Sequence, residues 1–250
     1  MVGFVSRERR DRAAAGGHAE PVLLEFRGVS RHYGHGDTLV KALDRVDLRV
    51  EEGDFVAVMG PSGSGKSTCM NLIGSLDTPT AGRYLFRGVD LAGLTRHQRA
   101  LFRRNYVGFV FQGYNLLKRT TALENVELPL VYRRLPAADR KRLAHAALDA
   151  VGLADRADHT TSEMSGGQQQ RVAIARAIVT EPAILLADEP TGNLDSEKSR
   201  EIMQLLAQLN SHRGITILMV THDANMAAFA RRAVRFLDGR IVADETKGPA

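Results

Sequence analysis

Short apolar runs separated by polar segments recur along the chain and predict buried β-strands. Residues 55–59, 184–187 and 215–220 are such runs, and they are too short for buried helices. Residues 66–76, after the first run, and 196–209, between the other two, carry apolar positions at helical spacing. Because buried strands that alternate with helices are typical of a parallel sheet, we expect an α/β fold.

The two ends of the chain show other patterns. Between residues 22 and 50, short segments are alternating or β-branched, which indicates an N-terminal antiparallel β region. Near the other end, Asp238 and Gly239 separate two short apolar runs and predict a hairpin turn. Residues 1–20 show no apolar period and carry several arginines, so we expect a disordered basic tail.

The middle of the chain, about residues 91–158, is richer in helical spacing and predicts an inserted helical subdomain. A chain of 250 residues is near the upper limit for one hydrophobic core. We therefore expect a single domain over residues 21–245, with a core at about 21–90 and 159–245 around the helical insert.

The amino-acid composition indicates a globular protein and excludes several kinds of structural site. Hydrophobic residues make up 44% and charged residues 25%, which is typical of a globular domain. The single cysteine, Cys69, excludes an internal disulfide framework and a cysteine-built zinc or iron–sulfur site. The short apolar start and the arginines after it do not resemble an export signal, so we expect cytoplasmic residence.

The formal net charge is +5, and its distribution is uneven. Residues 95–142 hold 11 Lys and Arg against three acids. Such a block fits nucleic acid, an anionic membrane surface or an acidic partner, and it fits a solvated helical face equally well. Charge alone leaves these alternatives open.

A glycine-rich turn follows the first apolar run and opens the first helical segment. Its residues fill every position of the phosphate-loop pattern: Gly60, Pro61, Ser62, Gly63, Ser64, Gly65, Lys66 and Ser67. Glycines let backbone N–H groups turn towards phosphate oxygens, and the helix directs its positive dipole end at them. Lys66 supplies a charge to the β- and γ-phosphates, and the Ser67 hydroxyl can ligate magnesium. The loop predicts a bound nucleoside triphosphate.

Two carboxylates follow the second apolar run. Asp188 is placed to hold magnesium through water, and Glu189 to act as general base on the attacking water. An acid after a strand can instead cap the next helix. Because two acids occur together downstream of a complete phosphate loop, a role in hydrolysis is favoured over helix capping.

Residues 164–168 read Met-Ser-Gly-Gly-Gln and, with residues 169–177, resemble the signature motif of the ATP-binding cassette (ABC) proteins. Met164 stands where the family usually has Leu. The resemblance implies that the signature of one subunit closes on the γ-phosphate held by the phosphate loop of another. It thus implies a head-to-tail homodimer with two ATP molecules and Mg²⁺ at its interface.

Further positions match the same family. The resemblance implies that Tyr33 stacks on adenine and that Gln112 contacts magnesium and the attacking water. It also implies that Asp195 lies in a loop that communicates across the dimer and that His222 hydrogen-bonds the γ-phosphate. The expected catalytic residues are Glu189, His222, Lys66 and Gln112, and the expected magnesium ligands are Ser67, Gln112 and Asp188. The expected nucleotide contacts are Tyr33, Gly60, Pro61, Ser62, Gly63, Ser64, Gly65, Lys66, Ser67, Thr68, Ser165, Gly166, Gly167, Gln168 and Asp195.

A narrower resemblance, to the MacB/LolD group with its FtsE relatives, covers residues 70–77, 108–112, 115–117, 121–126, 165–171 and 187–195. Tyr114 departs from the Phe that is usual there. The resemblance implies a peripheral ATPase on the cytoplasmic face of the inner membrane, working with transmembrane permease subunits and, in efflux systems, a periplasmic adaptor. Since the chain stops at Ala250, we expect the permease on a separate chain, docked at about residues 113–132 through Tyr114, Leu116, Leu117 and the 121–126 run.

Two other functions stay open. An FtsE-like ATPase would regulate a periplasmic process through a membrane partner without transport, and the sequence barely separates it from an exporter. A nucleic-acid-acting ABC ATPase fits the basic block. However, the chain has one cassette, no coiled-coil insert and no cysteine cluster, so we expect no nucleic acid partner.

Overall fold

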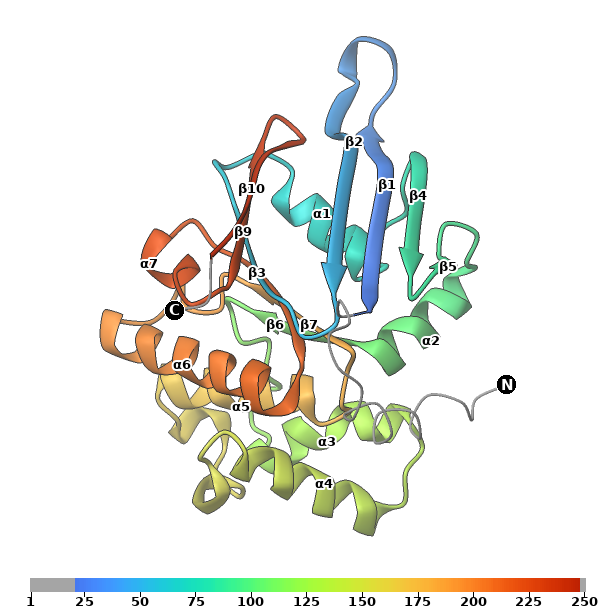
Figure 1. The fold of residues 1–250 in the computed structure, drawn as a ribbon. Helices are drawn as coiled ribbons and strands as arrows, with labels where there is room; N and C mark the ends of the chain where they lie inside the picture. Colours follow the sequence, from blue (N-terminus) through green and yellow to red (C-terminus); the bar gives the residue numbers. More distant parts are fainter. Residues whose placement is uncertain (1–20, 248–250) are drawn as a thin grey trace, which may run out of the picture.

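The computed structural model describes residues 21–247, and the expected tail at residues 1–20 lies outside this range. A six-stranded sheet runs through the centre of the domain in the order β10-β9-β3-β8-β7-β6 (Figure 1). Its strands are β3 (Phe55–Met59), β6 (Val107–Phe111), β7 (Ile184–Asp188), β8 (Thr216–Val220), β9 (Arg232–Leu237) and β10 (Arg240–Thr246). All neighbours pair in parallel except β9 and β10, which form the predicted hairpin. The α/β class is confirmed.

A second, antiparallel sheet has the order β2-β1-β4-β5. It consists of β1 (Val22–Tyr33), β2 (Val40–Glu51), β4 (Ala81–Phe86) and β5 (Val89–Asp90). Helix α1 (Lys66–Ile73) lies between this sheet and the central one (Figure 1), and its buried side chains join both sheets in one core. The expected N-terminal antiparallel region is confirmed.

Three helices cover the opposite face of the central sheet: α5 (Gly166–Ile178), α6 (Ser196–Arg213) and α7 (Ala224–Ala227). Alternate strand residues serve the two faces, since Val56 and Val58 join the core around α1 while Phe55 and Ala57 join the core around α5 and α6. Both faces are covered, which explains why the central strands are continuously apolar.

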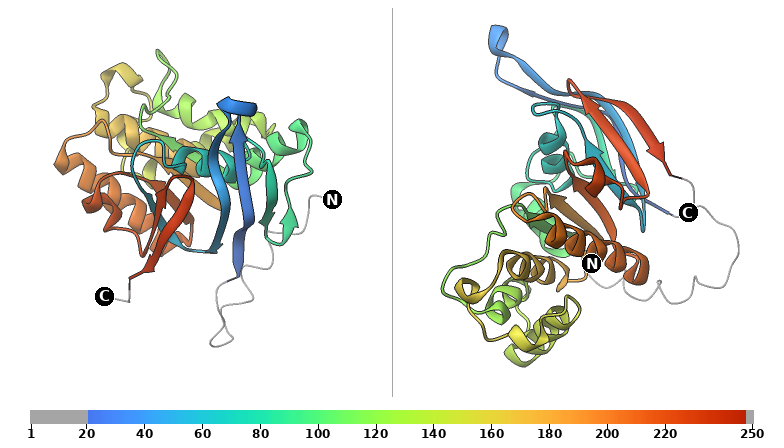
Figure 2. Two further views of the ribbon diagram at one scale, coloured as in Figure 1. Left: turned by 90° about the horizontal axis from the view of Figure 1, so that it is seen from above. Right: turned by 90° about the vertical axis from the view of Figure 1, so that its left-hand side faces the viewer.

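Helices α3 (Ala122–Tyr132) and α4 (Ala137–Asp149) pack with α5 at the end of the molecule away from the antiparallel sheet (Figure 2). Helix α2 (Arg96–Tyr106) instead packs its Phe102 against Phe86 of β4, with ring centroids 4.9 Å apart. Short 3-10 turns lie at Gly36–Thr38, Ala154–Arg156 and Thr161–Glu163. The segment 91–158 thus contains β6 of the central sheet as well as helices, and its division from the core stays a prediction.

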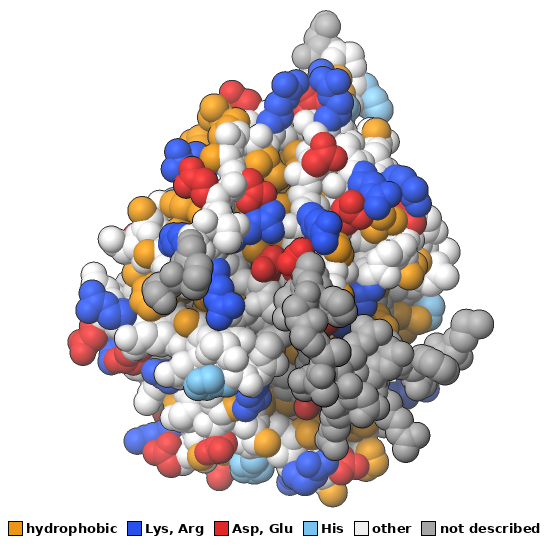
Figure 3. All heavy atoms as spheres, in the orientation of Figure 1, with side chains coloured by type: hydrophobic (Ala, Val, Ile, Leu, Met, Phe, Trp, Pro, Cys, Tyr) orange, Lys and Arg blue, Asp and Glu red, His pale blue; other side chains and the backbone are white. Residues whose placement is uncertain are grey.

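The surface of the described domain is mixed in charge. On the face shown in Figure 3, basic and acidic side chains are interspersed among apolar ones. Between residues 21 and 247, no helix is both long enough and apolar enough to cross a bilayer.

Candidate functional site

The carboxyl ends of four parallel strands meet at one edge of the central sheet. The register pairs Phe111 with Asp188 and Asp188 with Val220, and Val58 of β3 also pairs with Val220. Ligands of open α/β sheets bind beyond this edge. The segments that leave it carry the phosphate loop, Gln112, Glu189 and His222.

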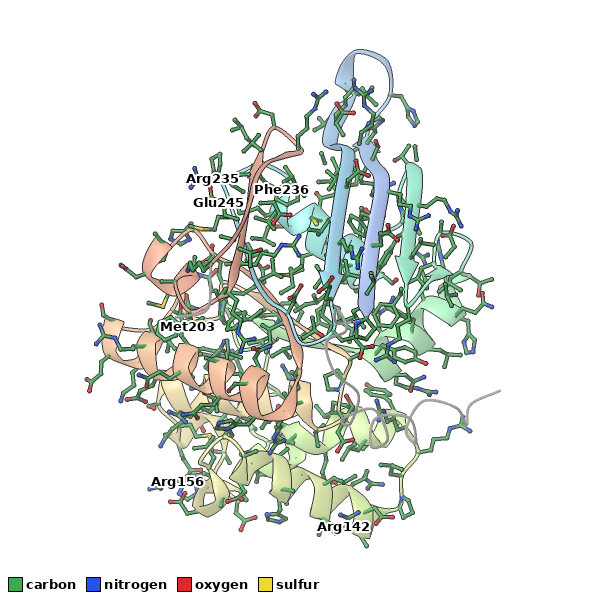
Figure 4. The ribbon with its side chains drawn as sticks, in the orientation of Figure 1. Arg142, Arg156, Met203, Arg235, Phe236 and Glu245 are labelled. Atoms are coloured by element: carbon green, nitrogen blue, oxygen red, sulfur yellow. The ribbon has the colours of Figure 1, made fainter. Side chains whose placement is uncertain are left out.

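Three glycines of the phosphate loop, Gly60, Gly63 and Gly65, have a left-handed φ, and at Gly60 and Gly65 a Cβ would also collide with neighbouring backbone. Gly60 has φ +146°, and a Cβ there would overlap the carbonyl of Phe236. Figure 4 shows Phe236 on the α1 side of β9, with Arg235 on the opposite side. Gly65 has φ +104°, and a Cβ there would lie 2.5 Å from the carbonyl oxygen of Ala42. The absence of side chains at Gly60 and Gly65 therefore lets the loop pack closely against the backbone of Phe236 and Ala42.

Polar groups of the loop fit a bound phosphate. Lys66 Nζ donates hydrogen bonds to the carbonyl oxygens of Gly60 (2.8 Å) and Pro61 (2.7 Å), so a phosphate competes with these for the ammonium group. The Ser64 hydroxyl is buried without a hydrogen-bond partner among the described residues. Helix α1 begins after Gly65 without a side-chain cap. Its first N–H groups, which include those of Ser67 and Thr68, can therefore bind an anion. Ser62, Gly63 and Ser67 are exposed.

The predicted general base and the predicted histidine touch each other. His222 Nδ1 lies 2.7 Å from Glu189 Oε1, although the two residues are 33 positions apart in the sequence. The hydrogen bond to Glu189 and its negative charge raise the pKa of His222. The Glu189 side chain is 20% exposed and that of His222 is 76% exposed, so the pair opens to solvent at the edge of the sheet.

Asp188 lies beside this pair in a setting that suits a cation. Burial raises its pKa, the Glu189 carboxylate raises it further, and only the Lys66 ammonium opposes the rise. A divalent cation would offset the cost of two adjacent carboxylates. Carboxylate and hydroxyl oxygens are ligands that Mg²⁺ prefers, so Asp188 with the Ser67 hydroxyl fits the expected magnesium site.

Gln112 makes a reciprocal amide pair with Asn193 that the sequence did not reveal. Gln112 Nε2 donates to Asn193 Oδ1 at 3.3 Å, and Asn193 Nδ2 donates to the backbone carbonyl oxygen of Gln112 at 2.9 Å. Gly192 lets the two segments approach, since a Cβ there would lie 2.6 Å from Gln112 Nε2. Gln112 is thus fixed to the loop that also carries Asp195, whose carboxylate caps α6 by accepting from the Lys198 N–H at 2.8 Å.

The signature residues form the start of α5. Ser165 and Gln168 make a capping box, in which each side chain accepts from the other's backbone N–H. Gly166 and Gly167 lie in the first turn, and Gly166 faces the hydroxyl of Tyr114. Because α1 and α5 cover opposite faces of the central sheet, the structure does not bring the signature of one described chain onto its own phosphate loop.

Tyr33, the expected adenine contact, belongs to a polar cluster at the end of β1. Its hydroxyl donates to Asp77 Oδ2 at 2.8 Å, and Arg31 Nε donates to the same oxygen at 2.8 Å. The Arg31 guanidinium lies 4.5 Å from the centre of the Tyr33 ring. No local pattern indicates Asp77, which follows α1, 44 residues further along the chain.

Sequence relatives carry names from one family. A family profile described as ABC transporter matches residues 43–192. The macrolide export ATP-binding/permease protein MacB of Hyphomonas neptunium is 50% identical over 224 residues, which cover 90% of this chain and 35% of that protein. MacB of Sodalis glossinidius is 50% identical over 89% of this chain and 34% of its own length. The chain spans about a third of the length of these relatives.

Solved structures agree with the sequence relatives. A dimeric bacterial ABC transporter cassette, MJ0796, is 43% identical with a TM-score of 0.82, covering 91% of this chain and 100% of that one. The same cassette in a post-hydrolysis state bound to ADP and Pi is 42% identical, with equal coverage and the same TM-score. The chain therefore belongs to the ABC transporter family, and it is an ATP-hydrolysing cassette of that family.

Proposed function

We propose that this cassette hydrolyses ATP at the edge of the central sheet with Glu189 as general base and His222 as its partner. The observation that carries the proposal is the 2.7 Å contact between Glu189 Oε1 and His222 Nδ1, at the ends of adjacent strands. A carboxylate held there can take a proton from a water that attacks the γ-phosphate. Lys66 and the first N–H groups of α1 stabilise charge on the phosphates.

Magnesium neutralises phosphate charge when bound with the nucleotide. Asp188 and the Ser67 hydroxyl would hold it directly or through water, and Gln112 would approach it from the neighbouring strand. The hydrogen bonds with Asn193 hold Gln112 against the neighbouring loop.

The test of the general base is Glu189→Gln, which keeps size and hydrogen bonding and removes the carboxylate. We expect ATP turnover to fall at least about a hundredfold, with ATP affinity retained because the phosphate loop is unchanged. Glu245→Gln is the matched control, since Glu245 is exposed on β10 (Figure 4). Equal turnover in Glu189→Gln and the control would refute the assignment.

The active form that we propose is a homodimer with ATP between the phosphate loop of one copy and residues 165–168 of the other. Two features support it. The signature turn and the phosphate loop lie on helices that cover opposite faces of one sheet, and the similar cassette MJ0796 is described as dimeric.

We further propose that the cassette powers a transmembrane permease of the MacB type. A largely apolar groove of about 730 Å³ lies between α2, β6, α3 and α5, and residues that line it include Leu101, Phe109, Leu128, Tyr132 and Arg176. Tyr132 is 69% exposed, and Val131, which precedes it but does not line the groove, is 47% exposed. A groove with exposed aromatic and aliphatic side chains suits an amphipathic segment of a partner.

The expected docking residues need one correction. Ala122, Leu123 and Val126 are buried in the core between α3, α4 and α5, so the 121–126 run cannot offer the apolar contacts that its sequence suggested. Leu117, Val131 and Tyr132 are exposed in its place.

Membrane association tests the permease proposal. Tyr132→Arg would replace an exposed ring with a further positive charge beside Arg103, Arg104 and Arg176, which already line the groove. We expect it to abolish copurification with a membrane permease from detergent extracts while leaving ATP hydrolysis by the cassette intact. Val242→Arg, at an exposed apolar position on β10, is the control. Unchanged permease recovery with Tyr132→Arg would refute docking in this groove. A location on the cytoplasmic face of the membrane follows from the proposal, and the periplasmic adaptor and the FtsE-like alternative stay predictions.

A further inference from the structure

A buried carboxamide joins helix α5 to the loop that carries Glu189. Gln170 is fully buried, and its Nε2 donates a 2.6 Å hydrogen bond to the carbonyl oxygen of Pro190. Pro190 directly follows Glu189. The Oε1 of Gln170 has no hydrogen-bond partner between residues 21 and 247, so within this range the Pro190 carbonyl is the polar anchor of the side chain.

The loop at Glu189 needs such an anchor. Glu189 has φ +46°, in the left-handed region that favours glycine, and the proline after it restricts its backbone further. Strained conformations of this kind persist only where the surroundings hold them. The Glu189 N–H donates to the carbonyl of Val220 at 3.0 Å, and the Glu189 carbonyl accepts from the Gly192 N–H at 3.0 Å. Gln170 supplies the third bond, on the next residue.

The position of Gln170 on α5 gives this bond a second consequence. The residue lies two positions after Gln168, in the helix that begins with the signature turn. The signature turn is proposed to act on ATP held by the other copy of the chain, whereas Glu189 acts on ATP held by its own. The hydrogen bond from Gln170 to Pro190 therefore joins the signature helix, which is proposed to contact one ATP, to the Glu189 loop, which is proposed to contact the other.

We propose that Gln170 is a positioning residue that holds the Glu189 loop in its hydrolytic conformation and ties that loop to the signature helix. The inference rests on the proposed role of Glu189. It assigns Gln170 no contact with ATP, and the effect of its loss must pass through Glu189.

The variant that tests it is Gln170→Leu, which keeps similar volume, removes the donor and leaves the buried Pro190 carbonyl unpaired. Gln170→Met, with a more flexible side chain, is made beside it in case the branched side chain is not accommodated. We expect kcat for ATP hydrolysis to fall about tenfold to a hundredfold, because small misplacement of a catalytic group is costly. KM for ATP should stay within about twofold, since the phosphate loop is untouched.

Asn210→Leu is the matched structural control. Asn210 is also a buried amide, and it donates to the carbonyls of Gly53 (2.7 Å) and Ile215 (2.9 Å) at the amino ends of β3 and β8. These ends lie at the edge of the sheet opposite Glu189. We expect a lower melting temperature with kcat retained at temperatures well below it.

A double-mutant cycle with Glu189→Gln separates positioning from general destabilisation. If Gln170 acts through Glu189, adding Gln170→Leu to Glu189→Gln leaves the residual turnover unchanged. An equal fold loss in both backgrounds, or a parental kcat in folded Gln170→Leu or Gln170→Met, overturns the inference while the role of Glu189 stands. Normal turnover in Glu189→Gln alone instead overturns the proposed function.

Discussion

Replacing Gly192 with alanine should disturb catalysis without unfolding the domain. The new Cβ would lie 2.6 Å from Gln112 Nε2, 3.0 Å from its Cδ and 3.1 Å from its Cγ. To reach ordinary contact the amide must retreat by about 0.8 Å. Its 3.3 Å hydrogen bond to Asn193 Oδ1 would then be too long to count as one. Gly192 has no left-handed φ, so alanine adds no backbone strain there.

The effects on stability and on activity should differ sharply. Gln112 and Asn193 are exposed, and losing a hydrogen bond there costs about 1 kcal/mol or less. For a domain of this size that is a melting-temperature shift of about 2–4 °C at most. Misplacing a catalytic group by about 1 Å can lower turnover by up to about a hundredfold. We therefore expect kcat of Gly192→Ala to fall at least about fivefold, measured as phosphate release at saturating ATP.

Two further variants decide whether the loss comes from Gln112. Gly93→Ala is the control, because a Cβ there meets no atom within 4 Å, and its turnover should match the parent. In a Gln112→Ala background the Gly192 substitution should have little further effect, since the side chain that it displaces is gone. Parental kcat in Gly192→Ala, or a full additional loss in the Gln112→Ala background, would show that Gly192 does not act on turnover through Gln112.

Three other predictions follow from the site. The pKa of His222, measured by NMR titration, should be lower in Glu189→Gln than in the parent, because the Glu189 carboxylate stabilises the protonated imidazole. The imidazole is fully protonated below the ordinary histidine pKa, and its interaction with Glu189 is lost as pH rises through the raised pKa of His222. Gly60→Ala should abolish binding of a fluorescent ATP analogue, because a Cβ would overlap the carbonyl of Phe236 at a φ of +146°; binding at parental affinity would show that the loop adapts. Chelation with EDTA should abolish turnover and added Mg²⁺ should restore it, because a cation at the proposed magnesium site would offset the burial and the neighbouring carboxylate that raise the pKa of Asp188. Turnover that persists in EDTA would contradict the magnesium site.

Features that depend on neighbours in the chain were predictable from the sequence. The strand, glycine-rich turn and helix around the phosphate loop lie within 20 residues, and Gly60 and Gly65, where a Cβ would collide with neighbouring backbone, are the two glycines of the pattern. Strands β3, β7 and β8 were predicted because both of their faces are buried, which leaves unbroken apolar runs. Strand β6 was not, because it lies inside the segment that was expected to be a helical insert. By contrast, β1 and β2 are longer than the predicted short segments. Bulges such as the register shift between Phe26 and Val29 break the period-two alternation from which strand length is read.

Features that depend on distant pairs were not predictable. The Gln112–Asn193 pair joins residues 81 positions apart, and Tyr33 meets Asp77 across 44 positions. Contacts between residues so far apart in the sequence produce no local pattern from which they could be predicted. The part of the docking expectation that concerned residues 121–126 was wrong for a related reason, since an apolar helical run looks the same whether it faces a partner or, like Leu123, a core. The expected end of the helix at residue 209 falls one turn short, because the last turn to Arg213 is polar and the stop signal is Gly214, with φ +61°.

The central claim is that ATP is held between two copies of this chain. The most direct measurement is the molar mass of Glu189→Gln by light scattering after size exclusion, over a range of concentrations with Mg²⁺ and ATP. We expect a shift to twice the 27.4 kDa of one chain, and reversal to the monomer when nucleotide is removed. A mass that stays at 27.4 kDa at every concentration, with ATP shown to be bound, would contradict it.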